Sequence, residues 1–311
     1  MKLIRGLHNL HPDHRGCVVT IGNFDGIHRG HQAVLAQLAR IGKEMGLPTV
    51  LLIFEPQTRE FFVPESAPIR LTRLREKLMA LRGLSLDRVC CLRFDHQLAG
   101  LTPPAFIERL LHRGLGARYV VVGDDFRFGY RREGDISMLR AAGERLGFQV
   151  GQMDTCLVAG QRVSSTRVRD ALGNGDFAMA EALLGRQYSL YGRIIHGDQR
   201  GRGMGFPTAN INLRRRILPM NGVFAVRVHG LEQQAIPGIA NVGVRPTVDG
   251  KRGLLEVHLL DFEGDIYTRR VQVAFLHKFR GEQRFDSLEA LKRQITRDVD
   301  SARRYFEGVV E

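Results

Sequence analysis

Two histidines three residues apart, His28 and His31, stand in a glycine-rich stretch at positions 22–31 (GNFDGIHRGH). An apolar run at 17–21 predicts a buried strand before the stretch, and an amphipathic pattern ending at Gly46 predicts a helix after it. A glycine-rich turn from strand to helix lets the backbone approach a phosphate, and the helix start adds N–H groups and a positive dipole. Two imidazoles on one side of the first helical turn can stabilise charge that develops on phosphorus during a displacement.

Two simpler interpretations compete with this one. A turn between two glycines is more often structural, and a His-x-x-His pair could be half of a metal site. Zinc, however, needs a third or fourth ligand, and the four cysteines (Cys17, Cys90, Cys91 and Cys156) have no partner spacing. The succession of strand, GNFDGIHRGH and helix therefore favours a nucleotide site.

This succession resembles the nucleotide-binding signature of the nucleotidyltransferase superfamily. In its fuller form it is similar to the adenylyltransferase module of the bacterial bifunctional riboflavin kinase/FAD synthetase family. The resemblance implies that both histidines are catalytic and that ATP is contacted by Gly22, Phe24, Asp25, Gly26 and Gly30.

A second motif, at 163–169 (VSSTRVR), begins another predicted helix. Hydroxyls at a helix start favour phosphate and an arginine can add a bidentate contact, but alone such a motif is only a good N-cap. Paired with the first motif, it resembles the superfamily's second phosphate-binding signature. The resemblance implies ATP contacts by Ser164, Ser165, Thr166 and Arg169.

Strands and helices alternate over the first part of the chain. Strands are predicted at 17–21, 49–54, 89–94, 119–122 and 148–150, and helices at 70–82 (with Thr72 a possible cap), 102–114 and 136–146. This alternation predicts a doubly wound parallel sheet, in which ligands bind beyond the carboxyl ends of the strands. The loops after the first, second and fourth strands should converge on one crevice, where we expect flavin contacts from Phe54, Asp125, Phe126 and Phe128.

The pattern changes near residue 184. Short strands are predicted at 188–196, 223–228, 236–242, 254–260 and 271–275, and a final helix at 287–306. Several of these strands alternate inward and outward, which predicts a small antiparallel β-barrel closed by a C-terminal helix. The predicted fold is therefore α/β, with an N-terminal doubly wound parallel-sheet domain at 1–184 and a C-terminal barrel domain at 185–311.

The predicted barrel carries its own glycine-rich stretch, 201–210 (GRGMGFPTAN). The glycines permit a loop around phosphates, and the Thr208 hydroxyl and Asn210 carbonyl are hard oxygen ligands suited to Mg²⁺. General rules leave a turn without chemistry equally open, because the Gly-Lys-Ser/Thr ending of a Walker A loop is absent. The stretch GFPTAN, however, resembles the riboflavin kinase signature, and 241–247 resembles that family's following loop. The resemblance implies ATP contacts by Gly201, Gly205, Pro207, Thr208 and Asn210.

The segment 256–261 (EVHLLD) is similar to the strand that carries the catalytic carboxylate of riboflavin kinases. Leu255 and Val257 flank Glu256, so alternation turns Glu256 to the opposite face of the strand. A general base for a substrate hydroxyl could lie there, although an exposed strand glutamate is usually just solvated. The role of Glu256 therefore depends mainly on the resemblance.

Composition limits the class of protein. The chain has 311 residues, 43% hydrophobic and 25% charged, which suffices for two domains with cores of their own. Apolar runs are too short for a membrane span, no signal peptide is evident and the cysteines form no framework, so we expect a cytoplasmic protein. The net charge of +13 fits nucleic acid or anionic small substrates, and the scattered basic residues favour small molecules.

The motifs follow the family's order over nearly the whole chain and imply two ATP-dependent transfers with Mg²⁺, from riboflavin to FMN and from FMN to FAD. The expected partners are these small molecules, without nucleic acid or membrane, for a monomer or weak homo-oligomer. Two departures are Gln57-Thr58, where many relatives carry His-Pro, and Thr268, where they commonly carry Gly. The rival hypotheses are a nucleic-acid-binding protein, suggested by charge, and a flavin-binding regulator without catalysis, which the intact histidine pair argues against.

Overall fold

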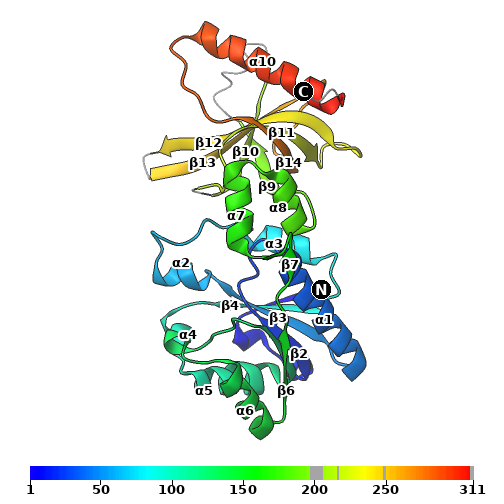
Figure 1. Cartoon of the computed structure of the whole chain (residues 1–311), viewed down its shortest axis with the longest axis vertical. Coiled ribbons are helices and arrows are strands. Elements are labelled where there is room, and N and C mark those ends of the chain that lie inside the picture. The colour runs from blue at the N-terminus through cyan, green and yellow to red at the C-terminus, as the bar shows by residue number, and fades with distance from the viewer. Residues whose placement is uncertain (197–205, 216, 248–249, 309–311) are drawn as a thin grey trace. The chain divides into compact units, whose positions relative to one another are not determined.

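The computed structural model describes residues 1–196, 206–215, 217–247 and 250–308, and the chain divides into two units (Figure 1). The first unit comprises Met1–Pro68 and Thr72–Ser164, and the second comprises Ile69–Leu71 and Ser165–Glu311. The second unit thus begins before the predicted boundary at 184/185, because two helices pack with the barrel. One of their residues, Phe177, lies edge-on to Phe224 and stacks on Phe275.

The first unit is built on a six-stranded parallel sheet with the order β1-β4-β3-β2-β5-β6. The strands are β1 (Lys2–Arg5), β2 (Cys17–Ile21), β3 (Thr49–Glu55), β4 (Arg88–Arg93), β5 (Ala117–Gly123) and β6 (Gln149–Met153). The five predicted strands and their parallel arrangement are confirmed. Strand β1 was missed because it is a short edge strand in which only Ile4 is buried, so its sequence has no apolar run.

Helices cover both faces of this sheet, which explains why β2 is buried along its whole length. On one face, α1 (Arg29–Met45) and α3 (Leu74–Leu81) pack through Leu35, Leu38 and Leu81. On the other face lie α5 (Pro103–Phe106), the π-helix η3 (Ile107–Leu115) and α6 (Ile136–Leu146). Shorter elements are η1 (Leu7–Asn9), η2 (Pro12–His14), α2 (Thr58–Phe62), α4 (His96–Ala99), η4 (Tyr130–Arg132) and the hairpin β7 (Leu157–Val158) and β8 (Gln161–Arg162).

Helix ends follow the capping rules at the start of α5 and at the end of α1. The Thr102 hydroxyl accepts from the Ala105 N–H at 3.4 Å with Pro103 in the first helical position, and Gly46 ends α1 in a left-handed conformation. The predicted cap at Thr72 is wrong, because α3 begins after Arg73. The Thr72 side chain is instead used in a long-range hydrogen bond described below.

The strand order places the ligand crevice of the first unit. Strand β2 lies between β3 and β5, so the chain leaves β2 toward one side of the sheet and later returns to its other side. In such sheets ligands bind outside the carboxyl ends of the strands at this reversal. The glycine-rich turn follows β2 and the Asp124–Phe128 loop follows β5, so the two predicted loops border the reversal.

The second unit contains α7 (Ser165–Asn174), α8 (Phe177–Leu184), a closed six-stranded antiparallel barrel and α10 (Leu288–Phe306). The barrel order is β10-β13-β12-β11-β14-β9, with β9 (Ser189–Ile195), β10 (Ala209–Asn212), β11 (Gly222–His229), β12 (Ile236–Thr247), β13 (Gly250–Leu259) and β14 (Arg270–Arg280). The predicted barrel and closing helix are confirmed. Strand β10 was missed because its four residues end a stretch rich in glycine and proline.

Helix α10 is anchored to the outside of the barrel. The Ser287 hydroxyl caps it by accepting from the Ala290 N–H at 3.1 Å, and Val299 and Ala302 pack in the apolar cluster with Val223 and Ile239. The buried Asp298 carboxylate accepts from Arg280 Nη2 at 2.6 Å and Nε at 3.0 Å. This bidentate pair fixes one face of α10 over β14.

The segment Ile69–Leu71 is held in the second unit through its backbone carbonyls. Arg215 Nη1 donates to the Arg70 carbonyl at 2.8 Å, and the Tyr188 hydroxyl donates to the Leu71 carbonyl at 3.0 Å. Arg169 Nε donates to the Ile69 carbonyl at 2.5 Å. Long side chains of α7 and the barrel thus bind a segment far away in the sequence.

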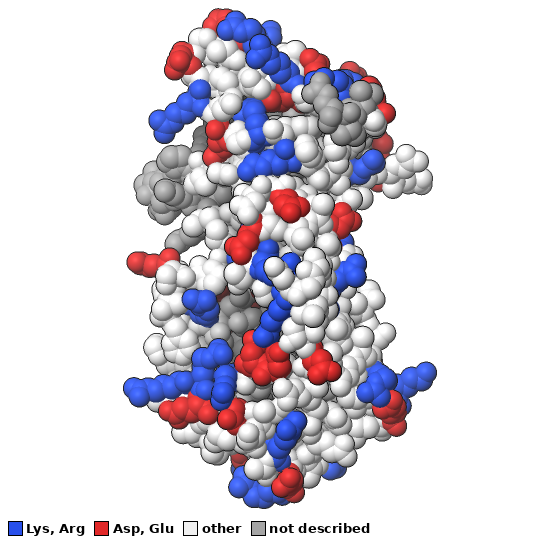
Figure 2. All heavy atoms as spheres, in the orientation of Figure 1, with Lys and Arg blue, Asp and Glu red and all other residues white. Residues whose placement is uncertain are grey.

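None of the helices within the described residues has the length and hydrophobicity that a membrane-spanning helix needs. On the face shown in Figure 2, Lys and Arg side chains stand at several separate places, often beside Asp or Glu. The basic residues of this face therefore form no single extended strip of the kind that tracks a nucleic-acid backbone.

Candidate active sites

The two histidines of the glycine-rich turn form a stacked pair. His28 is the N-cap of α1 rather than a residue of its first turn, and its Nδ1 accepts from the His31 N–H at 3.3 Å. The two rings stack with centroids 3.6 Å apart, and Phe24 stacks on His31 at 4.5 Å. Because Nδ1 of His28 accepts, a neutral ring carries its proton on Nε2, which makes Nε2 a donor for phosphate oxygens.

The backbone of the turn has unusual dihedral angles on the approach to the two rings. Phe24 and Ile27 both have φ of 47°, a conformation that is strained for a β-branched residue such as Ile27. A Cβ on Gly30 would lie 3.2 Å from the His28 ring, so a larger residue there would require the ring to shift by a small amount. Strain of this kind is concentrated at functional sites.

Asp25 holds the glycine-rich turn in place through hydrogen bonds to Thr72. Its side chain is buried, with 3% exposure, and Oδ1 accepts from the Thr72 N–H at 2.9 Å and from the Thr72 hydroxyl at 3.2 Å. The same hydroxyl accepts from the Gly26 N–H at 2.9 Å. The fully buried Lys77 adds a hydrogen bond from Nζ to the Asn23 carbonyl. Asp25 therefore has a structural role that the sequence did not reveal, and its contact with ATP stays a prediction.

The loop after β5 is clamped by Arg162 of β8. Arg162 Nη2 lies 2.9 Å from Asp124 Oδ1 and 3.0 Å from Asp125 Oδ2. A hydrogen bond from the Thr155 hydroxyl, helped by the charge of Arg162, outweighs the effect of desolvation and holds the pKa of Asp124 below its usual range. The carboxylate stays ionised at neutral pH, so the clamp persists under working conditions.

Three of the predicted flavin residues meet in one apolar cluster. Phe54 and Phe128 are buried members of it, and Phe126 packs against it with its ring stacked 5.5 Å from that of Phe128. Asp125, which lies in the same loop as Phe126 and Phe128, is exposed. The aromatic residues therefore come together, whereas a direct flavin contact by each stays a prediction.

A second group of aromatic residues was missed by sequence reasoning. Phe61 and Phe62 of α2 lie edge-on to Phe94 at 5.3 and 5.7 Å, and Phe94 lies edge-on to Phe54 at 5.6 Å. Phe62 is 60% exposed, which is unusual for a large apolar ring. Two successive phenylalanines in the loop after a buried strand were the signal available in the sequence. Exposed aromatic rings at the carboxyl edge of the sheet suit a planar ligand.

The second phosphate motif begins α7. Ser165 and Thr166 are its first residues, Ser164 precedes it and Arg169 lies in its second turn. Arg169 holds the Ile69 carbonyl through Nε, a contact that the sequence did not indicate. Binding of phosphate by these four residues stays a prediction.

Three of the predicted kinase residues, Thr208, Asn210 and Glu256, line one cavity of about 880 Å³ between the barrel and α10, whereas Pro207 is not among its lining residues. Asn210 of β10 pairs with Glu256 of β13, and Glu256 pairs with Asn241 of β12, so the three side chains lie on one face of neighbouring strands. Leu255 and Val257 are buried on the opposite face, which confirms the predicted alternation. Thr208 lines the same cavity.

Two features of this cavity were outside the sequence prediction. His258 Nδ1 donates to the Pro207 carbonyl at 2.8 Å, which anchors the segment that carries Thr208. Helix α10 adds apolar side chains to the lining, among them Leu291, Ile295 and Val299. The cavity is therefore lined by both polar and apolar groups. Gly201 and Gly205 lie outside the described residues.

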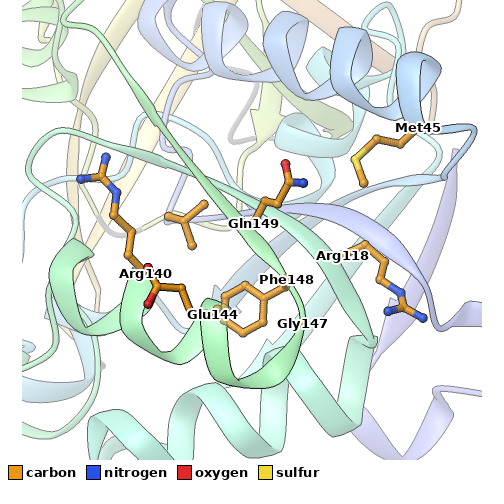
Figure 3. A pocket seen from close by; sticks show the side chains of 9 residues that line it. Met45, Arg118, Arg140, Glu144, Gly147, Phe148 and Gln149 are labelled. Carbon is orange, nitrogen blue, oxygen red and sulfur yellow. The ribbon is translucent and has the colours of Figure 1, made fainter.

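Another hollow, of about 570 Å³, lies at the amino ends of β5 and β6 and is lined by Met45, Arg118, Arg140 and Phe148, among others. Figure 3 shows the guanidinium groups of Arg118 and Arg140 at opposite sides of the opening and pointing away from each other. Because they do not converge, this hollow lacks the features of a phosphate site, and it lies at the sheet edge opposite the crevice.

The buried thiols are not suited to nucleophilic chemistry. Burial raises the pKa of Cys17 and of Cys90 to about 12, so both stay protonated at neutral pH.

Comparison with known proteins identifies two matched regions in the chain. Residues 10–167 match the FAD synthetase family model, and residues 184–306 match the riboflavin kinase model. A bifunctional riboflavin kinase/FMN adenylyltransferase of Escherichia coli K12 is 52% identical over 98% of both chains, and one of Pseudomonas fluorescens is 53% identical over 97% of both. A solved structure, named as a macrolide-efflux protein of Streptococcus pneumoniae, is 28% identical over 97% of this chain and 99% of its own, with a TM-score of 0.83. By its two matched regions and its full-length relatives, the chain belongs to the family of bifunctional riboflavin kinase/FMN adenylyltransferases.

Proposed function

We propose that this chain phosphorylates riboflavin to FMN in the barrel cavity and adenylylates FMN to FAD, with release of pyrophosphate, at the glycine-rich turn of the parallel sheet. ATP is the co-substrate of both steps. The observation that supports this most is the meeting of Thr208, Asn210 and Glu256 in one cavity whose lining is divided between such polar groups and apolar residues of α10. Riboflavin has the same division, because its ribityl chain is polar and its isoalloxazine ring system is largely apolar.

In the kinase step, Glu256 accepts the proton of the ribityl 5′-hydroxyl while that oxygen attacks the γ-phosphorus and ADP leaves. The neighbouring amides of Asn210 and Asn241 orient the carboxylate and the substrate hydroxyls. The apolar wall of α10 holds the ring system and excludes water. His258 positions Thr208 through the Pro207 carbonyl.

Magnesium fits the oxygen donors at this cavity. Within the described residues no three His, Cys, Asp or Glu side chains are grouped to hold a metal, which is expected for Mg²⁺ because phosphates and water supply most of its ligands. We assign its protein ligands to the Thr208 hydroxyl and the Asn210 carbonyl oxygen. Bound Mg²⁺ neutralises charge on the ATP phosphates.

In the adenylyl step, an oxygen of the FMN phosphate attacks the α-phosphorus of ATP and pyrophosphate leaves. His28 and His31 donate to oxygens that gain negative charge, and the N–H groups at the start of α1 add positive potential. Ser164, Ser165, Thr166 and Arg169 hold the leaving phosphates. The strained turn keeps the two rings in position before the substrates bind.

The direct test is incubation of the full chain with riboflavin, ATP and Mg²⁺, followed by chromatography of the flavins. FMN should appear first and FAD should follow, and chelation of the metal should stop both. Binding of nucleic acid with a strong salt dependence and no ATP turnover would instead support the rival suggested by the net charge. We place both reactions in the cytoplasm, for a monomer or weak homo-oligomer.

The two activities should separate between the domains that we place at 1–184 and 185–311. A fragment of residues 165–311 is expected to make FMN but no FAD. A fragment of residues 185–311 should do the same with a free energy of unfolding lower by about 3 kcal/mol, because it lacks the packing of Phe177 on Phe224 and Phe275. Chemical denaturation and flavin chromatography measure both quantities. A folded fragment without kinase activity, from a chain that has it, would refute the assignment.

Replacing Phe62 with alanine should raise the KM for FMN in FAD formation by roughly tenfold, the scale of one aromatic stacking contact. The ring is exposed, so stability should change little. Tyr130, another exposed aromatic residue of the same unit, provides the control as Tyr130→Ala. An unchanged KM for FMN would remove Phe62 from the flavin site.

A further inference from the structure

Two buried amide atoms at the carboxyl edge of the sheet lack hydrogen-bond partners among the residues that the structure describes. They are Oδ1 of Asn23, an acceptor, and Nε2 of Gln57, a donor. Gln57 as a whole is only 8% exposed. Most buried polar atoms in folded proteins are paired, because an unpaired one loses its hydration without compensation. Two such atoms close together call for an explanation.

The two residues lie on neighbouring loops. Asn23 belongs to the glycine-rich turn after β2, and Gln57 belongs to the loop after β3, which pairs with β2 in the sheet. The two loops are joined directly, since Asn23 Nδ2 lies 3.5 Å from the Thr58 hydroxyl to which it donates. The donor and the acceptor therefore belong to two adjoining loops at the carboxyl edge of the sheet, one leading to the histidine pair and the other to the aromatic residues of α2.

Both residues are held by their backbones. Lys77 Nζ donates to the Asn23 carbonyl, and the Gln57 N–H donates to Glu60 Oε2 at 3.0 Å. The backbones of both loops are thus held in place, while the two side-chain amide atoms have no partner among the described residues. A preorganised donor and acceptor, both already desolvated, are what a site needs to bind a polar group selectively.

We propose that Gln57 and Asn23 bind the ribityl phosphate portion of FMN in the adenylyl step. A phosphate or hydroxyl oxygen accepts from Gln57 Nε2, and a ribityl hydroxyl donates to Asn23 Oδ1. The position supports this ligand: Gln57 is the N-cap of α2, whose last residue is Phe62, and Asn23 is next to Phe24, which stacks on His31. If the isoalloxazine ring of FMN stacks on Phe62 and its phosphate lies near the histidines, the ribityl hydroxyls between them would pass these two amides. This inference rests on the proposed adenylyl transfer.

The test uses the full chain and measures FAD formation with FMN and ATP varied separately. Gln57→Met keeps the size of the side chain and removes the amide, so the KM for FMN should rise roughly tenfold. The KM for ATP should change less than twofold, and riboflavin phosphorylation should be unaltered. Gln57→His restores an N–H donor and should recover most of the loss. Asn23→Leu provides an independent variant with the same expected result.

A matched control is available on α1. Gln37 also has a buried amide atom, Oε1, without a partner among the described residues, but it lies more than a turn beyond the histidines. Gln37→Met should leave both KM values unchanged. Lumiflavin, which has the ring system without the ribityl phosphate, should inhibit the wild-type and Gln57→Met proteins equally, whereas Phe62→Ala should weaken its inhibition.

The outcomes separate the hypotheses. If Gln57→Met and Asn23→Leu leave the KM for FMN unchanged, the inference is wrong, and a raised melting temperature would then show that the two atoms are merely unsatisfied. A rise in the KM for ATP alone would overturn the choice of FMN as ligand. If the wild-type chain forms no FAD at all, the proposed function fails instead.

Discussion

Replacing Glu256 with glutamine is expected to lower the rate of riboflavin phosphorylation by roughly 10²–10⁴-fold, the usual contribution of a general base. Glutamine has nearly the same size and keeps one carbonyl oxygen, so the pairing of β13 with β10 and β12 should persist. What disappears is the group that accepts the proton of the 5′-hydroxyl. FAD formation from supplied FMN should stay normal, because its nucleophile is an already ionised phosphate.

The control for this variant is Glu263→Gln, which changes an exposed carboxylate in the turn after β13 and should have no effect. Glu282 is the alternative base, since it lines the same cavity. Stopped-time assays of FMN formation on Glu256→Gln and Glu282→Gln distinguish the two. If Glu256→Gln phosphorylates riboflavin at a near-normal rate while Glu282→Gln does not, the assignment of the base is wrong.

Replacing His28 or His31 with alanine is expected to slow FAD formation by roughly a hundredfold or more, the scale of losing one donor in the transition state. FMN formation should be nearly unchanged. The two variants should differ in stability, because His28 also caps α1 and its loss costs about 1 kcal/mol. Loss of the His31 ring removes stacking on both Phe24 and His28.

The stability effect can be separated from the chemical effect with His28→Asn. Asparagine is a good N-cap, so the free energy of unfolding should recover relative to His28→Ala, while FAD formation stays slow. His112→Ala, on η3 at the other face of the sheet, should leave FAD formation unchanged. Equal loss of both activities in the histidine variants would indicate misfolding or a shared site.

Most elements of the fold could be predicted because their signals are local. Strands such as β2 are continuous apolar runs, since both faces of the parallel sheet are covered by helices. The caps at Thr102 and Ser287 follow from side-chain chemistry next to the helix start. Strands β1 and β10 were not predicted, because each has only four residues and too few buried positions to show a period.

The division of the chain into two units does not follow from local sequence patterns. The break in pattern near residue 184 marks the end of alternating helices and strands, but the second unit begins at Ser165. Phe177 is buried against barrel residues Phe224 and Phe275, and no periodicity in the sequence says which core an apolar helix joins. Packing between distant segments decides this.

For the sites, the sequence by itself determined which residues share a face. The alternation around Glu256 follows from the period of a strand, whereas the histidines, three residues apart, meet through the cap of α1 rather than on a helix face. Only the tertiary structure decided what these residues meet: the Asp25–Thr72 hydrogen bond spans 47 positions, and α10 completes the kinase cavity from the far end of the chain. The physical reason is that backbone periodicity is a local property, whereas long-range partners are selected by the burial and hydrogen-bond satisfaction of the whole fold.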